Sequence, residues 1–259
     1  MEFTDGDTYL SSFDSKAYLT SFCCLGSERD GILKFRMRKL YETFGPGGIT
    51  GDVLIDIGTG PTIYQLLSAC ESFPYIFASD FTDQNRQEFE KWLKNDPEAF
   101  DWSEIVKTVC EIEGKSSDKW EEKQDRLRSR IQKVLKCDVN KSNPLDPVEI
   151  PPADCLITSL CLETACKDLD AYYSAIRNIT KLLRPGGHLV VIGALGNTYY
   201  RVQQKDFFCL SLREDTVINA ITQAGYKVLS MDVFSISERE AHSNTADSMA
   251  NFFLVAKKS

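Results

Sequence analysis

Two glycines and an aspartate carry the clearest chemical signal in this chain. Gly58 and Gly60 follow an apolar run, Val53–Ile57, and Asp80 ends the next such run, Tyr75–Ser79. Glycines at a strand-to-helix turn let the backbone approach a ligand closely, and a carboxylate at the end of the second strand can accept hydrogen bonds from the two hydroxyls of a ribose. The pattern predicts a nucleoside-binding site at the carboxyl ends of parallel strands.

This signal also has structural alternatives. Many strand-to-helix junctions carry two glycines and bind nothing, and Asp80 could cap the next helix, although Asp83 suffices for that role. A nicotinamide-dinucleotide dehydrogenase is disfavoured, because the turn Gly58–Ile63 lacks the third glycine of the dinucleotide motif. We therefore favour the ribose-binding role for Asp80.

The composition excludes several other classes of protein. The 259 residues are 42% hydrophobic and 26% charged, with a net charge of −8, which disfavours nucleic acid and anionic membrane as partners. Nine cysteines, two histidines and no C-x-x-C pair favour reduced thiols over disulfides or a metal site. Because the sequence also shows neither an apolar run of about 18 residues nor a signal peptide, we expect a cytoplasmic protein.

Alternating helix-like and strand-like segments must hold the glycines and the aspartate in place. The periodicity predicts helices over residues 32–44, 83–94, 115–136, 169–183 and 214–224, and further strands over residues 155–161, 188–192, 226–234 and 251–256. A short polar loop joins the last two strands and leaves no room for a crossover helix, so this pair should be antiparallel. Residues 1–30 hold five spaced aromatic side chains, which would either pin an N-terminal arm to the core or form a lid. The pattern predicts an α/β fold with a doubly wound sheet.

These motifs resemble those of the nicotinamide, phenylethanolamine and indolethylamine (thioether) N-methyltransferases. The resemblance begins with Leu54–Ala69 and continues through Ser79–Asn85, Glu90–Lys94, Val134–Val139, Pro152–Cys155 and Leu183–Gly187. It implies a class I methyltransferase that uses S-adenosylmethionine, with a Rossmann-like seven-stranded sheet, an antiparallel last strand and helices on both faces. It also implies a monomer with one domain over residues 1–259, made of an N-terminal helical lid (1–45) and a core (46–259).

The resemblance assigns roles to individual positions of the cofactor site. Tyr18 would close the lid and is the candidate catalytic residue. The remaining positions are Gly58 and Gly60 beside the methionine portion, Tyr64 near its carboxylate, Asp80 and Asn85 at the ribose, Asp138 and Val139 at the adenine edge, and Ser159 near the methionine amino group.

The acceptor pocket departs from that of the nicotinamide-methylating members. Where those members carry polar groups that would bind a pyridine carboxamide, this chain has Cys23, Gly193, Cys209 and Ala241. Losing such groups costs about 1–3 kcal/mol each, so nicotinamide should be a poor acceptor. We expect an indolethylamine-like amine, or a thioether, in a pocket that includes Leu160, Gly193, Ala194, Tyr200 and Cys209.

The sequence leaves the acceptor and the proton chemistry open. Nicotinamide methylation and a catalytically weak, nucleotide-binding homologue are the alternatives to an amine methyltransferase. An in-line displacement needs mainly the alignment of the acceptor with the methyl group, and no general base if the acceptor arrives neutral. Glu163 would either take up a proton or orient an amine, or it would simply begin a helix.

Overall fold

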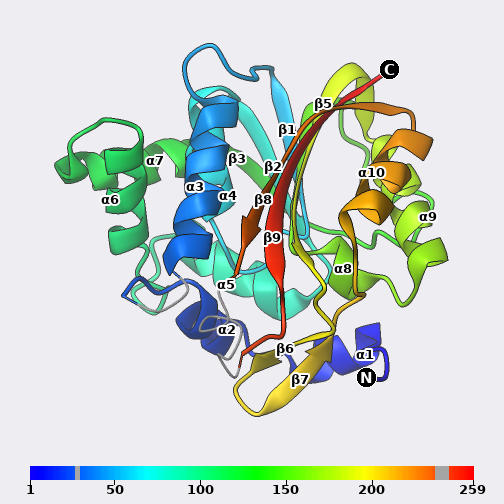
Figure 1. Cartoon of the computed structure of the whole chain (residues 1–259). Coiled ribbons are helices and arrows are strands. Elements are labelled where there is room, and N and C mark those ends of the chain that lie inside the picture. Colours follow the sequence, from blue (N-terminus) through cyan, green and yellow to red (C-terminus); the bar gives the residue numbers. More distant parts are fainter. Residues whose placement is uncertain (27–29, 237–244) are drawn as a thin grey trace.

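A seven-stranded sheet forms the centre of the molecule (Figure 1). The computed structural model describes residues 1–26, 30–236 and 245–259, and in this part of the chain the strand order is β3-β2-β1-β4-β5-β9-β8. The first five strands pair in parallel, and β9 is antiparallel to both of its neighbours. The predicted fold class and the antiparallel last pair are thus confirmed. The strands are β1 (Val53–Ile57), β2 (Tyr75–Asp80), β3 (Ile131–Lys136), β4 (Ala153–Ser159), β5 (Leu183–Leu195), β8 (Tyr226–Ser235) and β9 (Ala250–Lys258).

Helices cover both faces of this sheet (Figure 1). Successive residues of a strand point to opposite faces, so Leu54 of β1 enters one hydrophobic cluster and Ile55 enters the other. The first cluster is covered by α3 (Asp30–Phe44), α4 (Tyr64–Leu67), η1 (Ala69–Glu71), α5 (Asp83–Leu93), α6 (Ser103–Ile112) and α7 (Trp120–Arg130), with η2 (Ser117–Lys119) before α7. The second is covered by α8 (Leu162–Ala165), α9 (Leu169–Thr180) and α10 (Glu214–Gln223).

One predicted helix is wrong over its last six residues. The expected helix over residues 115–136 ends at Arg130, and residues 131–136 form β3. Their backbone pairs in parallel with β2, with Ala78 opposite Val134 and Asp80 opposite Lys136. The spacing of Ile131, Val134 and Leu135 suits a helix as well as a strand. The polar residues between them gave no indication of a strand, because an edge strand of this kind buries only one of its sides.

The leader and a small hairpin meet at the end of the sheet where the parallel strands finish (Figure 1). The leader forms α1 (Gly6–Ser12) and α2 (Ser15–Phe22), and the hairpin, which the periodicity did not predict, pairs β6 (Tyr199–Val202) with β7 (Lys205–Phe208). The hydroxyls of Tyr9 and Tyr200 lie 2.7 Å apart, and the backbone N–H of Phe208 donates to Thr4 Oγ1 at 2.9 Å. These contacts fasten the N-terminal helices over the strand ends.

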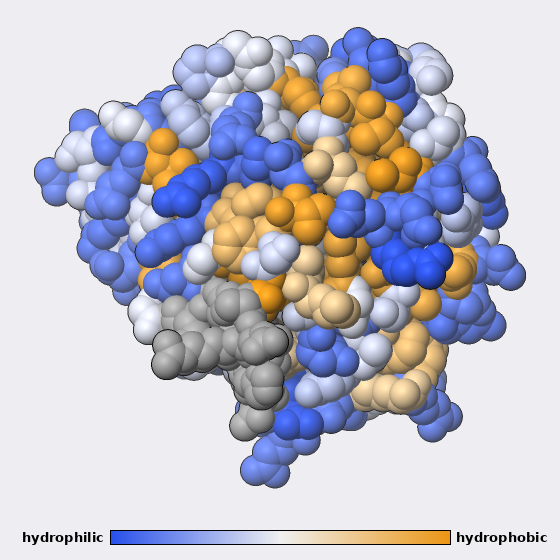
Figure 2. Space-filling view, in the orientation of Figure 1, coloured by the Kyte–Doolittle hydropathy of each residue, from blue (hydrophilic) through white to orange (hydrophobic). Residues whose placement is uncertain are grey.

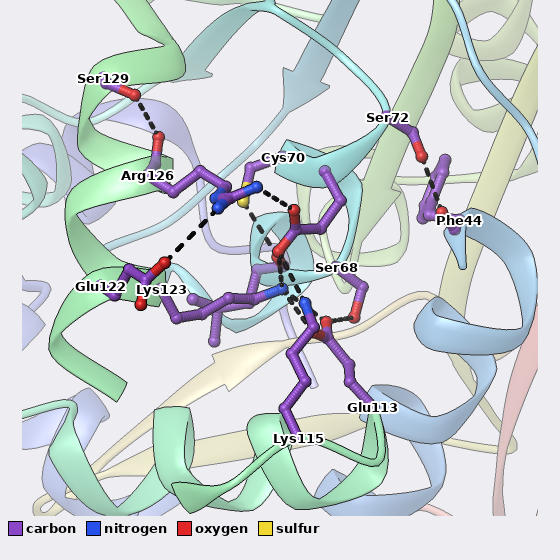
Figure 3. A network of polar contacts seen from close by, with 12 residues as sticks. Phe44, Ser68, Cys70, Ser72, Glu113, Lys115, Glu122, Lys123, Arg126 and Ser129 are labelled. Carbon is purple, nitrogen blue, oxygen red and sulfur yellow. Dashed lines mark hydrogen bonds and ion pairs between the residues drawn. The ribbon is translucent and has the colours of Figure 1, made fainter. Parts of the chain in front are cut away.

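A buried ionic cluster fixes the helices that follow the glycine turn (Figure 3). Lys123 of α7 donates to Glu113 Oε1 at 2.6 Å and to Glu71 Oε1 at 2.9 Å. Ser68 Oγ donates to the same Glu113 oxygen at 2.9 Å. Because Ser68 and Glu71 belong to the segment after the glycine turn, the cluster joins α7 to the element that shapes the site.

The edge strand β8 carries exposed apolar side chains. Figure 2 shows apolar residues gathered along the course of β8 within a mostly hydrophilic face. Leu229 and Val233 are among the exposed large hydrophobic residues. No helix within the described ranges combines the length and the apolarity needed to cross a bilayer.

Candidate functional site

A cavity of about 360 Å³ lies between the ends of the parallel strands and the N-terminal helices. Among the described residues, it is lined by every site residue predicted from the sequence except Gly193 and Cys23. These lining residues are Tyr18, Gly58, Gly60, Tyr64, Asp80, Asn85, Asp138, Val139, Ser159, Leu160, Ala194, Tyr200 and Cys209. Residues that lie far apart in the chain are thus brought to one place by the strand order.

The glycine turn at the end of β1 requires glycine for two different reasons. Gly58 has a φ of +71°, and a Cβ on it would lie 2.2 Å from Cys161 Sγ. Gly60 has a φ of +60° with open space around its Cβ position, so only its backbone conformation demands glycine. The turn therefore brings main-chain atoms, rather than side chains, to the cavity wall.

Asp80 joins this turn to the next strand and helix. Its Oδ1 accepts from Thr82 N at 2.9 Å, Thr82 Oγ1 at 3.0 Å and Asn85 Nδ2 at 3.1 Å. Within the described part of the chain, its Oδ2 accepts only the N–H of Gly60, at 2.9 Å, and so keeps acceptor capacity for a ligand hydroxyl. Burial raises the pKa of Asp80, while the hydrogen bonds from Thr82, Asn85 and Gly60 oppose that rise.

The loop after β3 forms a second wall. The N–H of Asn140 donates to Asp138 Oδ1 at 3.0 Å, and Asn178 Nδ2 donates to the carbonyl of Val139 at 3.1 Å. The N–H of Cys137 donates to the carbonyl of Asp80 at 3.1 Å, which links this loop to the carboxylate. The predicted adenine-reading residues Asp138 and Val139 are therefore held next to the predicted ribose ligand.

A third wall combines α3, α4 and the ends of β4 and β9. The hydroxyls of Tyr64 and Ser159 lie 3.0 Å apart, and Arg36 Nη1 donates to Tyr64 Oη at 3.5 Å. Arg36 Nη2 donates to Asn251 Oδ1. The guanidinium thus lies beside the two residues expected near the methionine portion.

Glu163 is a buried acidic side chain that lines the same cavity. Its Oε1 accepts the N–H of Ala194 at 3.0 Å. Burial raises the pKa of Glu163 to about 7, although its hydrogen bonds and the charge of Arg36 act to lower it. A carboxyl with this pKa exchanges a proton near neutral pH, as a proton acceptor for an amine must.

The remaining acceptor positions lie around Glu163. Leu160 has a φ of +53° and lines the cavity, a backbone conformation that leucine rarely adopts. Cys209 and Asn197 are buried in the same wall, and Asn197 Oδ1 has no hydrogen-bond partner. An unpaired amide oxygen in a cavity wall suits a ligand donor such as an N–H group.

Two of the predicted acceptor differences, Gly193 and Cys23, are not among the residues that line the cavity. Gly193 is absent from the described lining, and a Cβ there would meet Phe252 at 2.6 Å and Glu163 Oε1 at 3.3 Å. Cys23 is buried away from the lining, and burial raises the pKa of its thiol to about 12. Ala241 lies outside the described residues.

The periodicity missed several lining residues, of which Arg36, Asn197 and Asn251 matter most chemically. Arg36 lies three residues after Leu33 and four before Leu40, on a helix face that is otherwise buried. A charged residue on an apolar stripe is a signal that the sequence did offer. Asn197 and Asn251 gave no comparable signal, because only the packing of β5 and β9 brings them to the site.

Comparisons with known proteins bear on the family and the fold of this chain. The model described as the NNMT/PNMT/TEMT family matches residues 1–259. The indolethylamine N-methyltransferase of Oryctolagus cuniculus is 48% identical, and the nicotinamide N-methyltransferase of Homo sapiens 47%, each over 99% of this chain and 97% of that protein. A crystal structure of magnesium protoporphyrin IX methyltransferase from Synechocystis PCC 6803 with bound SAM covers 98% of both chains, with a TM-score of 0.61. At 10% identity, this last likeness shows the fold alone.

Proposed function

The chain belongs to the NNMT/PNMT/TEMT family, and from this premise we propose that it transfers the methyl group of S-adenosylmethionine to the nitrogen of a small amine or N-heterocycle. The observation that carries the proposal is the environment of Asp80. Its carboxylate closes the glycine turn through Gly60, and one of its oxygens retains capacity for a further hydrogen bond. That donor and acceptor pattern suits a ribose.

The residues present fit this cofactor. Asp80 would hold the ribose hydroxyls, Asp138 and Val139 the adenine edge, and Tyr64 and Ser159 the methionine portion. When bound, S-adenosylmethionine supplies a sulfonium methyl group that is already strongly electrophilic. The protein must then mainly align the acceptor and exclude water. Alignment alone can lower the activation barrier by several kcal/mol, up to about 7–11.

The acceptor end supports an amine. Glu163 is positioned by Ala194 and has a pKa near 7, so it can take a proton from an ammonium group and leave the nitrogen lone pair free. Tyr18 and Tyr200 line the cavity from the lid and the hairpin, and their ring centroids lie 6.4 Å apart. Aromatic faces favour a cationic group beside them.

We rank acceptors within this proposal. Indolethylamine-like amines come first, thioethers are also accepted, and nicotinamide is the alternative.

The enzyme acts as a cytoplasmic monomer, with residues 1–45 as lid and 46–259 as core of one domain. A catalytically weak homologue that only binds the nucleotide is the rival.

Calorimetric titration with S-adenosylhomocysteine tests the cofactor site. Asp80→Asn should weaken binding roughly 10- to 100-fold, because a charged acceptor of ligand hydrogen bonds is lost. Asp83→Asn removes a nearby exposed carboxylate and is the matched control. Equal affinity of Asp80→Asn and the wild type, with thermal unfolding unchanged, would contradict the assignment.

Radiolabelled methyl transfer tests the acceptor. The panel is tryptamine, phenylethanolamine, nicotinamide and dimethyl sulfide. We expect kcat/KM to be highest for tryptamine. Nicotinamide turnover above that of tryptamine would reverse the ranking, and binding of S-adenosylhomocysteine without transfer to any of the four would favour the nucleotide-binding homologue.

A further inference from the structure

Arg36 is a cation in the cavity wall that lacks an anionic partner. It projects from α3 and contacts the cavity together with Tyr64, Ser159 and Asn251. Within the residues that the structure describes, it forms no ion pair with an aspartate or glutamate, and its protein partners are a phenol and an amide. A charge kept partly out of water without a counter-ion is costly unless something else compensates it.

The described residues do not provide an acceptor for every N–H donor of the Arg36 guanidinium. A guanidinium carries five N–H donors. Nη1 reaches Tyr64 Oη only at 3.5 Å, a long contact, and Nη2 donates to Asn251 Oδ1. Nε is fully buried and has no acceptor among the residues that the structure describes. The planar guanidinium therefore has unused N–H donors at the cavity wall. Two parallel N–H donors of a guanidinium are the arrangement that binds a carboxylate.

The ionisable groups around Arg36 do not supply the missing charge. Glu163 feels its field, yet burial raises the pKa of this carboxyl to about 7, so it is largely uncharged below neutral pH. Cys23 and Tyr18 also feel the field, and burial raises the pKa of both well above neutrality. Asp80 already has four donors at the opposite wall. Below neutral pH, the positive charge thus faces the cavity with neutral or already hydrogen-bonded groups as its described neighbours.

We propose that Arg36 binds a carboxylate of one of the two reactants. The inference rests on the proposed function, and two sources share this chemistry: the methionine carboxylate of the cofactor, and a carboxylate on the acceptor. The contact with Tyr64, itself bonded to Ser159, points toward the cofactor. The contact with Asn251 and the nearby Glu163 point toward the acceptor.

The first arm of the test is a thermodynamic cycle on cofactor binding. Calorimetry measures S-adenosylhomocysteine and its decarboxylated form on the wild type and on Arg36→Gln. If Arg36 holds the cofactor carboxylate, the substitution weakens S-adenosylhomocysteine roughly 10- to 100-fold and leaves the decarboxylated form nearly unchanged. Because the decarboxylated ligand reports on the same cavity, its unchanged affinity also shows that the variant is folded.

The second arm compares acceptors that differ by a carboxylate. Binding of tryptophan against tryptamine, and of nicotinate against nicotinamide, is measured by calorimetry on protein saturated with S-adenosylhomocysteine, and KM is measured in the transfer assay. If Arg36 holds an acceptor carboxylate, Arg36→Gln weakens tryptophan or nicotinate roughly 10- to 100-fold and spares the member of that pair that has no carboxylate. Arg38→Gln removes an exposed cation from the same helix and is the control.

The outcomes separate this inference from the proposed function. A selective loss in either arm supports the inference and identifies the source of the carboxylate. If Arg36→Gln affects the members of every pair equally, Arg36 is a structural link between α3 and β9 and the inference is overturned. If the wild type binds neither S-adenosylhomocysteine nor its decarboxylated form, the proposed function itself fails.

Discussion

At the residue scale, the chemistry of the site depends on where charge is placed and how it is screened. Asp80 and Glu163 are both buried carboxyls, yet their surroundings differ. Asp80 accepts four hydrogen bonds, whereas the side chain of Glu163 accepts one from Ala194. Hydrogen bonds from fixed donors favour the ionised form, so the first is suited to hold a ligand hydroxyl and the second to exchange a proton.

Glu163→Gln should change the pH dependence of amine methylation. Because the pKa of Glu163 is about 7, its carboxylate form is populated above that pH, and kcat/KM for tryptamine should rise through it as pH increases. The glutamine variant keeps an acceptor oxygen for the N–H of Ala194 but has no proton to exchange, so this inflection should vanish. Transfer rates measured from about pH 6 to pH 8 give the profile.

Nicotinamide is the control acceptor, because its ring nitrogen is neutral in this range and needs no base. Its profile should show no inflection that depends on Glu163. An inflection near pH 7 that persists with tryptamine in Glu163→Gln would assign the proton exchange to another group.

At the element scale, helix α2 of the N-terminal leader is connected to the carboxylate of Asp80 by a short chain of hydrogen bonds. Ser15 Oγ, in the first turn of α2, donates to Asn85 Oδ1 at 2.7 Å. Asn85 Nδ2 in turn donates to Asp80 Oδ1 at 3.1 Å. All three residues are buried, so the bonds are poorly screened by water. The position of α2 and the orientation of the Asp80 carboxylate are therefore coupled through Asn85.

Ser15→Ala should loosen this connection without removing any expected ligand contact. One buried hydrogen bond is worth about 1 kcal/mol, so the affinity for S-adenosylhomocysteine should fall about fivefold, mainly through faster dissociation. Stopped-flow fluorescence measures the dissociation rate. Ser11→Ala, at an exposed serine of the same leader, is the control.

The Ser15→Ala effect should also depend on Asp80. In the Asp80→Asn background the substitution should cost less than in the wild type, since the chain of bonds is already broken. Additive losses would show that Ser15 stabilises α2 without influencing the carboxylate.

At the scale of the whole molecule, helices α6 and α7 are joined to the segment after the glycine turn by ion pairs as well as by apolar packing. Lys123 and Glu113 are both buried and lie within 2.6 Å, with Glu71 completing the cluster (Figure 3). Burial raises the pKa of Glu71, but the bonds and charges of Lys123 and Lys115 outweigh it and lower that pKa to about 2. Glu71 is therefore ionised at neutral pH.

Lys123→Met should destabilise the protein by about 3 kcal/mol, because it leaves Glu113 buried with less compensation. Urea denaturation at neutral pH measures the free energy of unfolding. Lys119→Met removes the exposed pair with Glu122 and should cost at most about 1 kcal/mol. Equal losses in the two variants would mean that the buried cluster contributes no more than a surface pair.

The sequence by itself determined the cofactor end of the site. Gly58, Gly60 and Asp80 belong to one strand-turn-helix-strand unit, and the chemistry of such a unit follows from residues close together in the chain. The order of alternating elements likewise predicted the doubly wound sheet and its antiparallel last pair. The resemblance added the adenine and methionine positions, which the fold places around the same cavity.

Only the tertiary structure decided the rest, because it depends on contacts between distant residues. Residues 131–136 became a strand through pairing with β2, which outweighed their helical spacing. Arg36 meets Asn251 across 215 positions, and Ser15 meets Asn85 across 70. The pKa of Glu163 is likewise set by burial, which no local pattern reveals. Hence the cofactor could be predicted from the sequence, whereas the lid connection and the free donors of Arg36 appear only once the chain is folded.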